Sequence, residues 1–405
     1  MSEWKCYKLN EISSLSNGIN FDKSAYTSGV KLIGVSDFKN RMHPDYDSLQ
    51  EVDSKVVKSG DYLGKGDIVF VRSNGNKELV GRCMMIDRDI PVTYSGFCIK
   101  LRLNDKKRFD PVFFNYLFRT RQFKKSMTGT TVGANIQNLS QSRLGSCEVN
   151  VPEIETQREI ATILSRYDSL IENYQKQIKL LEEAAQRLYK EWFVDLRFPG
   201  HQSTPIINNL PQGWEKKSAK DFFTMSIGKT PPRAESSWFS TDDKDVPWVS
   251  ISDMKDVMFV NITNERLTHE ACDHFNVKIV PEGTILLSFK LTVGRVSIAD
   301  KPVCTNEAIA HFMRDGDNWR EYTLMYLRNY HYDSLGNTSG ISKAVNSTII
   351  KNMPFVMPSN DILDGFSKMS SPIINRIRNL STQIRNLSEA RDRLLPKLMS
   401  AEIEV

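Results

Sequence analysis

The strongest hydrophobic pattern in the chain lies between residues 153 and 193. Two apolar series recur there every seven residues, and the second lies four places after the first. The first series is Ile160, Tyr167, Tyr174, Leu181 and Leu188, and the second is Leu164, Ile171, Ile178, Ala185 and Trp192. Charged and amide side chains fill the other positions, as in a coiled-coil seam. The pattern predicts one helix of roughly 38 residues, a rod of about 57 Å at ~1.5 Å per residue.

A single apolar seam needs a partner helix, and the C-terminal part of the chain has a matching pattern. Its two series are Phe366, Ile373, Leu380, Leu387 and Leu394, with Ile377, Ile384 and Leu398 as companions. We therefore expect two long antiparallel helices that form an intramolecular coiled coil. Pro372 stands early in this second seam, and its ring and missing N–H are expected to start or kink the helix.

The two helical stretches belong to a duplication that covers the chain. A shift of 206 positions places Glu183-Ala184 on Glu389-Ala390, and residues 35–38 answer to residues 251–254. Each helix therefore follows a similar globular half. Short apolar runs between glycine-containing turns predict a mostly β domain in each half. In the first half, strands are expected at 30–35, 67–71, 82–86 and 97–103, and a helix at 111–125.

The predicted fold class is α+β, with two tandem-duplicated mixed α/β domains separated by the two long antiparallel helices. The segment between the halves is rich in Pro, Asn, Ser and Gly, which predicts a linker. The predicted boundaries are 1–152 for the first domain, 153–198 for the central helix, 199–212 for the linker, 213–357 for the second domain and 358–405 for the C-terminal helix.

Composition adds a bias toward a polyanionic partner. The chain has 405 residues, of which 40% are hydrophobic and 25% charged, as in soluble proteins of two or three domains. Residues 1–152 hold 23 Lys and Arg against 16 Asp and Glu, whereas residues 199–357 hold 17 against 18. The basic first half favours binding to nucleic acid, and the second half adds no such support.

The sequence shows no signal for a membrane or an oxidising compartment. The N-terminus lacks a basic segment leading into an apolar one, and no run of about 18 apolar residues occurs. The six cysteines include no CxxC pair, so neither a disulfide framework nor a cysteine zinc site is indicated. We therefore expect a cytoplasmic protein with reduced thiols.

Three fragments imitate catalytic or ligand sites, but each departs from its motif. Residues 228–230 (Gly-Lys-Thr) end like a nucleotide-binding loop, yet Phe223 stands where that motif needs glycine. Residues 352–355 (Asn-Met-Pro-Phe) lack a proline of the amino-methyltransferase motif, and their equivalents in the first half, residues 146–149 (Ser-Cys-Glu-Val), indicate the lead-in to a strand. The His, Cys and Asp residues of 269–274 lack the HExxH spacing. No catalytic or metal residue is predicted, which favours a binding subunit.

Polar and basic loops recur at equivalent places in both halves. They include residues 72–77, 128–137 and a basic strip at 119–125 in the first half, and 290–292 and 337–343 in the second. Such side chains hydrogen-bond phosphates and base edges, although each loop alone is also compatible with a solvated turn. The candidate DNA-binding residues are Arg72, Asn74, Lys77, Arg121, Lys124, Lys125, Thr130, Thr131, Asn135, Lys229, Thr230, Arg233, Lys290 and Lys343.

Several segments resemble those of a known family. Residues 133–139 (Gly-Ala-Asn-Ile-Gln-Asn-Leu), 149–152 (Val-Asn-Val-Pro) and 155–160 (Glu-Thr-Gln-Arg-Glu-Ile), which lead into the heptad helix, resemble the junction in specificity subunits of type I restriction-modification systems. Further matches are residues 210–214 (Leu-Pro-Gln-Gly-Trp), 228–231 (Gly-Lys-Thr-Pro), 246–253 and 305–310 (Thr-Asn-Glu-Ala-Ile-Ala). The first half departs from the pattern because it keeps only Trp4 of the Leu-Pro-x-Gly-Trp opening.

The resemblance implies two target-recognition domains, each reading one half of a split, asymmetric site in double-stranded DNA, with the helices as a ruler. It implies two adenine-N6 methyltransferase subunits and motor-nuclease (restriction) subunits as partners, and a non-catalytic role for this chain. S-adenosylmethionine, ATP and magnesium would bind to the partners and not to this chain. The exposed faces of the two helices are the candidate docking surface.

Two other classes of function are compatible with parts of the pattern. One is a solitary methyltransferase or nuclease fused to its own recognition domains, against which the missing methyltransferase motifs argue. The other is a coiled-coil scaffold that does not bind DNA. Salt dependence separates the scaffold from a DNA reader, because phosphate contacts weaken steeply with ionic strength.

Overall fold

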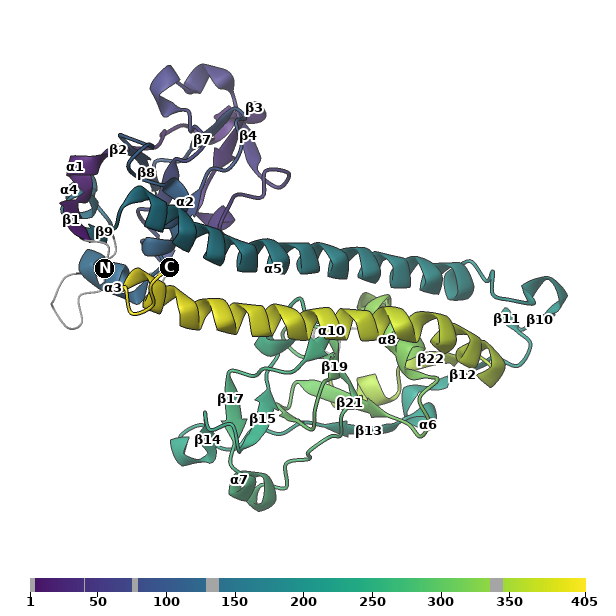
Figure 1. Ribbon diagram of the computed structural model, residues 1–405. Helices are drawn as coiled ribbons and strands as arrows, with labels where there is room; N and C mark the ends of the chain where they lie inside the picture. The colour runs from purple at the N-terminus through teal and green to yellow at the C-terminus, as the bar shows by residue number, and fades with distance from the viewer. Residues whose placement is uncertain (1–3, 40, 75–78, 129–137, 336–344) are drawn as a thin grey trace. The chain divides into compact units, whose positions relative to one another are not determined.

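The computed structural model describes residues 4–39, 41–74, 79–128, 138–335 and 345–405. The chain divides into two compact units, unit 1 (Met1–Glu172 and Arg385–Val405) and unit 2 (Asn173–Ile384). Each unit contains one globular half and parts of both long helices (Figure 1). The predicted fold class, two mixed α/β domains with long helices, is confirmed.

Unit 1 is built on a four-stranded antiparallel sheet. Its order is β2 (Ser13–Asn17), β8 (Cys98–Leu103), β5 (Ile68–Val71) and β6 (Cys83–Met85). A second sheet has the order β4 (Gln50–Val52), β3 (Tyr26–Ile33) and β7 (Val92–Tyr94), and β3 and β7 run parallel. The two sheets share a core, and β1 (Lys5–Lys8) pairs with β9 (Glu148–Val151), so the globular half begins and ends on one ribbon.

The short α-helices in the described part of unit 1 are α1 (Leu9–Ile12), α2 (Pro111–Leu117), α3 (Arg121–Thr128) and α4 (Gln141–Gly145). The single helix predicted at 111–125 is wrong, because α2 and α3 are separate. The Thr120 hydroxyl donates to the Leu117 carbonyl (2.7 Å) and accepts from the Phe123 N–H (3.2 Å). Thr120 thus takes over backbone partners that a continuous helix would use and acts as the cap of α3.

Unit 2 repeats this arrangement with additions. Its larger sheet has the order β13 (Thr224–Ile227), β21 (Ile309–Met313), β18 (Ile285–Ser288), β19 (Val296–Ala299) and β16 (Phe259–Val260). Its smaller sheet has the order β14 (Phe239–Ser240), β17 (Glu265–Leu267), β15 (Val246–Val249) and β20 (Cys304–Thr305), with β15 and β20 parallel. The closing ribbon pairs β12 (Glu215–Ser218) with β22 (Pro354–Met357).

The helices of unit 2 are α6 (Ala219–Phe222), α7 (His269–His274), α8 (Arg320–Arg328) and α9 (Ser347–Lys351). The segment predicted as a linker contains a small hairpin of β10 (Ile206–Ile207) and β11 (Leu210–Pro211). Phe198, just before it, is buried and its ring lies 5.4 Å from that of Trp214. The two residues that flank this segment are therefore tied to the core of unit 2.

The two long helices are α5 (Ile154–Tyr189), which continues into one π-helical turn at Lys190–Val194, and α10 (Asn360–Met399). The expectation that Pro372 starts the second helix is wrong, because α10 begins at Asn360. Leu363 and Phe366 before the proline and Ile374 after it are all buried in the core of unit 2. Their packing holds the turn helical despite the ~3 kcal/mol that an interior proline costs.

The two helices run antiparallel inside each unit. In unit 2 the rings of Trp192 and Phe366 lie 5.8 Å apart, and Arg376 donates to Gln177 at 3.5 Å. The later residue of the first helix thus contacts the earlier residue of the second helix, which is the antiparallel arrangement. In unit 1 Ile160 of α5 shares a core with Leu398 of α10. Every residue of the predicted seam is buried or half-buried.

Candidate nucleic-acid interface

Three loops of unit 2 converge where β13, β18 and β21 end or begin. They are the loop after β13, the turn between β18 and β19, and the segment between β20 and β21. The Lys229 N–H donates to the Thr305 carbonyl (2.9 Å), and the Phe289 N–H donates to the Ala308 carbonyl (2.9 Å). These backbone hydrogen bonds tie the three loops into one surface.

Gly228 permits this convergence. A Cβ atom at Gly228 would lie 2.0 Å from Thr305 Oγ1 and 2.2 Å from the Asn306 carbonyl oxygen, distances that no side chain tolerates. The residue is therefore a close-approach glycine, which explains the Gly-Lys-Thr turn without a nucleotide.

Glu307 lies at the centre of the side chains on this surface. It is exposed, and the Thr230 hydroxyl donates to its Oε2 atom. Burial alone would raise the Glu307 pKa, but the Thr230 hydrogen bond, its own backbone N–H and the charges of Lys290 and Arg233 together hold that pKa below its usual value. Glu307 is thus an ionised carboxylate among basic neighbours.

Arg233 is placed on this surface by aromatic rings. Its guanidinium carbon lies 4.3 Å from the centre of the Phe239 ring and 4.6 Å from that of Trp248, and its Nη1 atom pairs with Glu265 at 2.8 Å. Stacking on rings fixes the plane of the guanidinium and leaves part of it open to solvent. Lys229 is exposed and donates to the Phe275 carbonyl at 2.6 Å. We call residues Lys229, Thr230, Arg233, Lys290 and Glu307 the unit 2 loop surface.

Unit 1 builds the same loop junction with the same backbone hydrogen bonds. The Ile19 N–H donates to the Tyr94 carbonyl (2.9 Å), as Lys229 does to Thr305, and the Arg72 N–H donates to the Phe97 carbonyl (2.8 Å), as Phe289 does to Ala308. Gly18 and Gly228 likewise donate to Cys98 and Ile309. By this register Asn20 is equivalent to Thr230, and Gly96 to Glu307.

The unit 1 candidates lie around this junction and on α3. The Arg72 guanidinium is half-buried and lies 3.5 Å from the Gly96 carbonyl oxygen, and Asn74 is half-buried on the same turn. On α3, Arg121, Lys124 and Lys125 are exposed. The apolar side of α3, with Phe123 and Met127, is buried in the core of unit 1, so this helix presents its basic side to solvent.

The structure thus brings Lys229, Thr230, Arg233 and Lys290 together, and it places Arg72 beside the equivalent loop of unit 1. Five further candidates, Lys77, Thr130, Thr131, Asn135 and Lys343, lie outside the described residues. Sequence reasoning missed Glu307 and Asn20 as site residues, although both stand in segments that repeat between the halves. The sequence signal that could have identified Glu307 was the presence of an acidic residue among loops that are otherwise basic.

A separate cleft of about 1010 Å³ lies in unit 1, lined by residues of the larger sheet and the first part of α5, among them His43, Asp67, Asp168 and Glu172. None of the predicted DNA-binding residues that the structure describes lines it.

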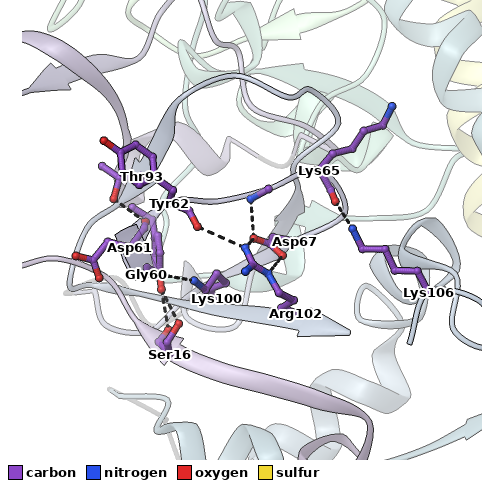
Figure 2. Close-up of polar contacts among 12 residues, drawn as sticks. Ser16, Gly60, Asp61, Tyr62, Lys65, Asp67, Thr93, Lys100, Arg102 and Lys106 are labelled. Atoms are coloured by element: carbon purple, nitrogen blue, oxygen red, sulfur yellow. Dashed lines mark hydrogen bonds and ion pairs between the residues drawn. The ribbon is translucent and has the colours of Figure 1, made fainter. Parts of the chain in front are cut away.

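The polar groups beside this cleft are largely paired. Figure 2 shows Asp67, which is 1% exposed, held by Arg102 through two hydrogen bonds of 2.7 and 2.5 Å. Lys100 donates to the Gly60 carbonyl (2.9 Å), and Lys106 donates to that of Lys65 (2.6 Å). The network joins β5 and β8 to the neighbouring loops, which is a structural role.

No group of three or more His, Cys, Asp or Glu side chains that could hold a metal ion occurs within the described residues. On α7, His274 stacks on Trp238 with ring centres 5.5 Å apart, so its ring is used in packing. In the part of the chain that the structure describes, no helix is long and apolar enough to cross a membrane.

Comparison with known proteins gives a consistent result. The sequence matches the type I restriction modification DNA specificity domain over residues 1–183 and 211–385. It is 24% identical over 479 aligned residues to the type I restriction enzyme HindI specificity subunit of Haemophilus influenzae, with 100% of both chains covered. It is 29% identical to the MjaIX specificity subunit of Methanocaldococcus jannaschii, with 72% of this chain and 69% of that one covered.

The fold is also found in a solved structure. The type I restriction-modification S subunit from M. genitalium superposes with a TM-score of 0.61 at 15% identity, and 98% of this chain and 96% of that chain are covered.

Proposed function

The chain belongs to the type I restriction-modification DNA specificity family, and on this premise we propose that it recognises a bipartite, asymmetric site in double-stranded DNA. The family predicted from the sequence is confirmed. As a specificity subunit, the chain is the DNA-recognising and non-catalytic member of such a system. Each unit reads one half-site in this proposal.

The duplicated loop junction is the observation that carries the proposal. Both units hold it with the same backbone hydrogen bonds, and in each unit basic or amide side chains surround it: Arg72 and Asn20 in unit 1, Arg233 and Lys290 in unit 2. Two similar readers with different side chains recognise two different short sequences, which together make a split and asymmetric site.

The proposed partners are two adenine-N6 methyltransferase subunits and motor-nuclease subunits, which carry S-adenosylmethionine, ATP and magnesium and act in the cytoplasm. The exposed faces of α5 and α10 are the proposed docking surface. Apolar side chains on α5 support it, because Leu170 is 44% exposed and Leu180 is 65% exposed. Both leucines lie on exposed positions of α5, where a partner subunit could cover them.

Genome-wide mapping of N6-methyladenine tests the proposal. The chain is expressed with an adenine-N6 methyltransferase subunit of the same type of system, first unchanged and then with residues 1–150 replaced by those of another family member. We expect methylation at a split motif, and a change in only one half-motif after the replacement. Absence of a split motif, or a motif that does not follow the replaced domain, would refute the proposal.

Direct binding separates a DNA reader from a protein scaffold. The affinity of the full chain for duplex DNA should fall steeply with salt. For each phosphate contact, the logarithm of the binding constant should fall by about 0.9 for every tenfold rise in salt concentration. The triple variant Arg121→Ala, Lys124→Ala, Lys125→Ala should weaken binding to all sequences and reduce the salt slope. Lys55→Ala with Lys107→Ala is the control, because both lysines are exposed in unit 1 and lie outside the candidate set. A chain with no affinity for DNA would favour the scaffold.

A further inference from the structure

The equivalent loop junctions differ at one pair of positions. In unit 1 the pair is Asn20 and Gly96, and in unit 2 it is Thr230 and Glu307. A Cβ atom at Gly96 would lie 2.0 Å from Asn20 Oδ1, so the Asn20 side chain fills the space that a side chain at position 96 would need. The long polar side chain therefore comes from the first loop in unit 1 and from the second loop in unit 2.

Both of these side chains are exposed. In unit 2 the Thr230 hydroxyl donates to Glu307 Oε2, and the backbone N–H of Glu307 also contributes a hydrogen bond to its carboxylate. These two hydrogen bonds orient the carboxylate, and because an ionised carboxylate has about four lone-pair sites, it can accept further hydrogen bonds from a ligand. Glu307 is thus an exposed hydrogen-bond acceptor whose orientation is fixed by its own loop and by Thr230.

A carboxylate is an unexpected group on a surface that contacts phosphates. Like charges repel, so Glu307 weakens sequence-independent binding, and its neighbours Lys290 and Arg233 only offset this repulsion. Such a group gains affinity where it meets a hydrogen-bond donor. On the major-groove edges of DNA the donors are the amino groups of cytosine and adenine.

The hydrogen-bonding groups on the major-groove edges of cytosine and adenine decide which of the two bases suits Glu307. Adenine presents the acceptor N7 beside its N6 amino group, which repels a second carboxylate oxygen, whereas cytosine presents only the N4 amino group. An ionised Glu307 therefore fits cytosine. The Asn20 amide has both a donor and an acceptor, which match N7 and N6 of adenine.

We propose that this pair of positions reads one base pair in each half-site, with Glu307 accepting from N4 of a cytosine and Asn20 bonding N6 and N7 of an adenine. The inference rests on the proposed function and adds one base identity to each half of the site. It assigns specificity to two residues outside the basic candidate set.

The test measures the affinity of the full chain for a set of duplexes. The wild-type motif comes from the methylation mapping, the domain replacement shows which half belongs to which unit, and each duplex carries one changed base pair. We expect wild-type protein to reject changes at one C·G pair of the unit 2 half-site by roughly tenfold or more. Glu307→Ala should reduce that rejection to less than about twofold and leave the other positions unchanged.

Glu307→Gln gives a more specific result, because glutamine pairs with adenine N6 and N7. It should shift the preference at the same position from C·G to A·T while keeping the side-chain size. Asn20→Ala should relax one A·T pair in the other half-site. Glu215→Ala is the matched control, since it removes an exposed acid from β12 of the same unit. Thermal unfolding of each variant confirms that the protein is folded.

The outcomes separate this inference from the proposed function. If wild-type protein shows a split motif but the Glu307 variants weaken all duplexes equally, Glu307 only positions its loop and the inference is wrong. The same holds if the sensitive base pair is not C·G. If wild-type protein shows no split motif, both proposals fail.

Discussion

Leu291 stands at the tip of the turn between β18 and β19 and is 99% exposed, with a φ of +59°. The left-handed region is unfavourable for a residue with a branched side chain, and no burial of the Leu291 side chain offsets that strain. The strained residue lies next to Lys290, on a loop of the candidate interface. Strained backbone is commonly found at such functional sites.

Replacing Leu291 by glycine should therefore stabilise the protein. Glycine adopts positive φ without a Cβ clash, but it also increases the entropy of the unfolded chain, so we expect a gain of about 0.5–1 kcal/mol in the free energy of unfolding. Urea unfolding measures it. Leu291→Ala is the control, because it removes the exposed side chain but keeps Cβ. Equal gains from both variants would show that backbone strain is not the cause.

His311 is fully buried between two hydroxyl groups in unit 2. Its Nδ1 atom lies 2.8 Å from Ser226 Oγ, and its Nε2 atom lies 2.8 Å from Thr305 Oγ1, one residue before the Asn306-Glu307 segment. Burial, with the nearby charge of Lys278, lowers the His311 pKa to about 4.

His311 is therefore neutral in the folded protein. Between pH 6.5 and about 4 the histidine of the unfolded chain is protonated while His311 of the folded chain is not, so the unfolded chain binds more protons. The stability that depends on this histidine is fully present above pH 6.5 and is lost as the pH falls through this window. Its size is about 3 kcal/mol at most. Urea unfolding at several pH values should show a smaller loss for His311→Gln than for wild-type protein. Equal pH dependence of the two proteins would contradict the assignment.

At the scale of elements, the seven-residue pattern was sufficient for the long helices, because a buried stripe on a helix leaves a regular signal in sequence. Shorter elements were less predictable. Phe113, Phe114, Phe118 and Phe123 all bury apolar surface, so nothing in their pattern reveals that Thr120 separates α2 from α3. Pro372 does not start the second long helix, because packing of the residues on both sides of it overrides the local preference of proline for a helix start.

In the candidate site, too, the features that depend on local sequence could be predicted and those that depend on tertiary packing could not. Basic loop residues such as Arg233 and Lys290 could be selected from composition, because charge in a turn is visible locally. The approach of Glu307 to Thr230 was not predictable, because it depends on which strands pair across unit 2 and on the close approach at Gly228. Contacts between residues far apart in sequence leave no periodic signal.

One polar cluster joins three helices within unit 1. Asp168 of α5 is 8% exposed and accepts hydrogen bonds from the Tyr116 hydroxyl of α2 and from Arg391 of α10. Burial and the Asp168 charge raise the pKa of Tyr116, so its hydroxyl stays a donor. The cluster replaces apolar packing at one level of the helix pair.

Removing the carboxylate should therefore be costly. Asp168→Ala removes the buried acceptor of both the Tyr116 hydroxyl and Arg391 Nη1, and Arg391 keeps only its pair with the exposed Asp392. We expect the free energy of unfolding to fall by about 2 kcal/mol in chemical denaturation. Glu172→Ala, one turn further along α5 and exposed, should change it by less than about 0.5 kcal/mol. A double variant with Arg391→Ala should lose less than the sum of the two single losses. Additive losses would mean that the two side chains do not act together.

At the scale of the whole molecule, the chain consists of one domain design used twice, with a long helix after each copy. The strand order of the larger sheet, the parallel pair in the smaller sheet and the closing ribbon recur in both units. The side chains at the loop junction are what differ, as Gly96 and Glu307 illustrate. Under the proposed function, duplication of the scaffold with divergence of the loops would allow each half-site to change independently.

The helices should set the distance between the two half-sites. α5 is continuous over 36 residues and α10 over 40, and the contacts Gln177–Arg376 and Asp168–Arg391 mark which segments face each other. Deleting residues 170–176 together with residues 380–386 removes one heptad from each helix and keeps the seam in register. The pair of deletions shortens the rod by about 10.5 Å, the length of roughly three base pairs.

We expect the double deletion to shorten the spacer of the methylated motif by roughly three base pairs and to leave both half-site sequences unchanged, as read by N6-methyladenine mapping. Shortening the spacer also rotates one half-site about the DNA axis by roughly a third of a turn, so activity should fall even where the motif is found. Inserting one heptad into each helix is the opposite control and should lengthen the spacer. Deleting the heptad from α5 alone puts the seams out of register and should abolish methylation. A changed half-site, or a spacer that stays constant in both double variants, would show that the helices do not measure the site.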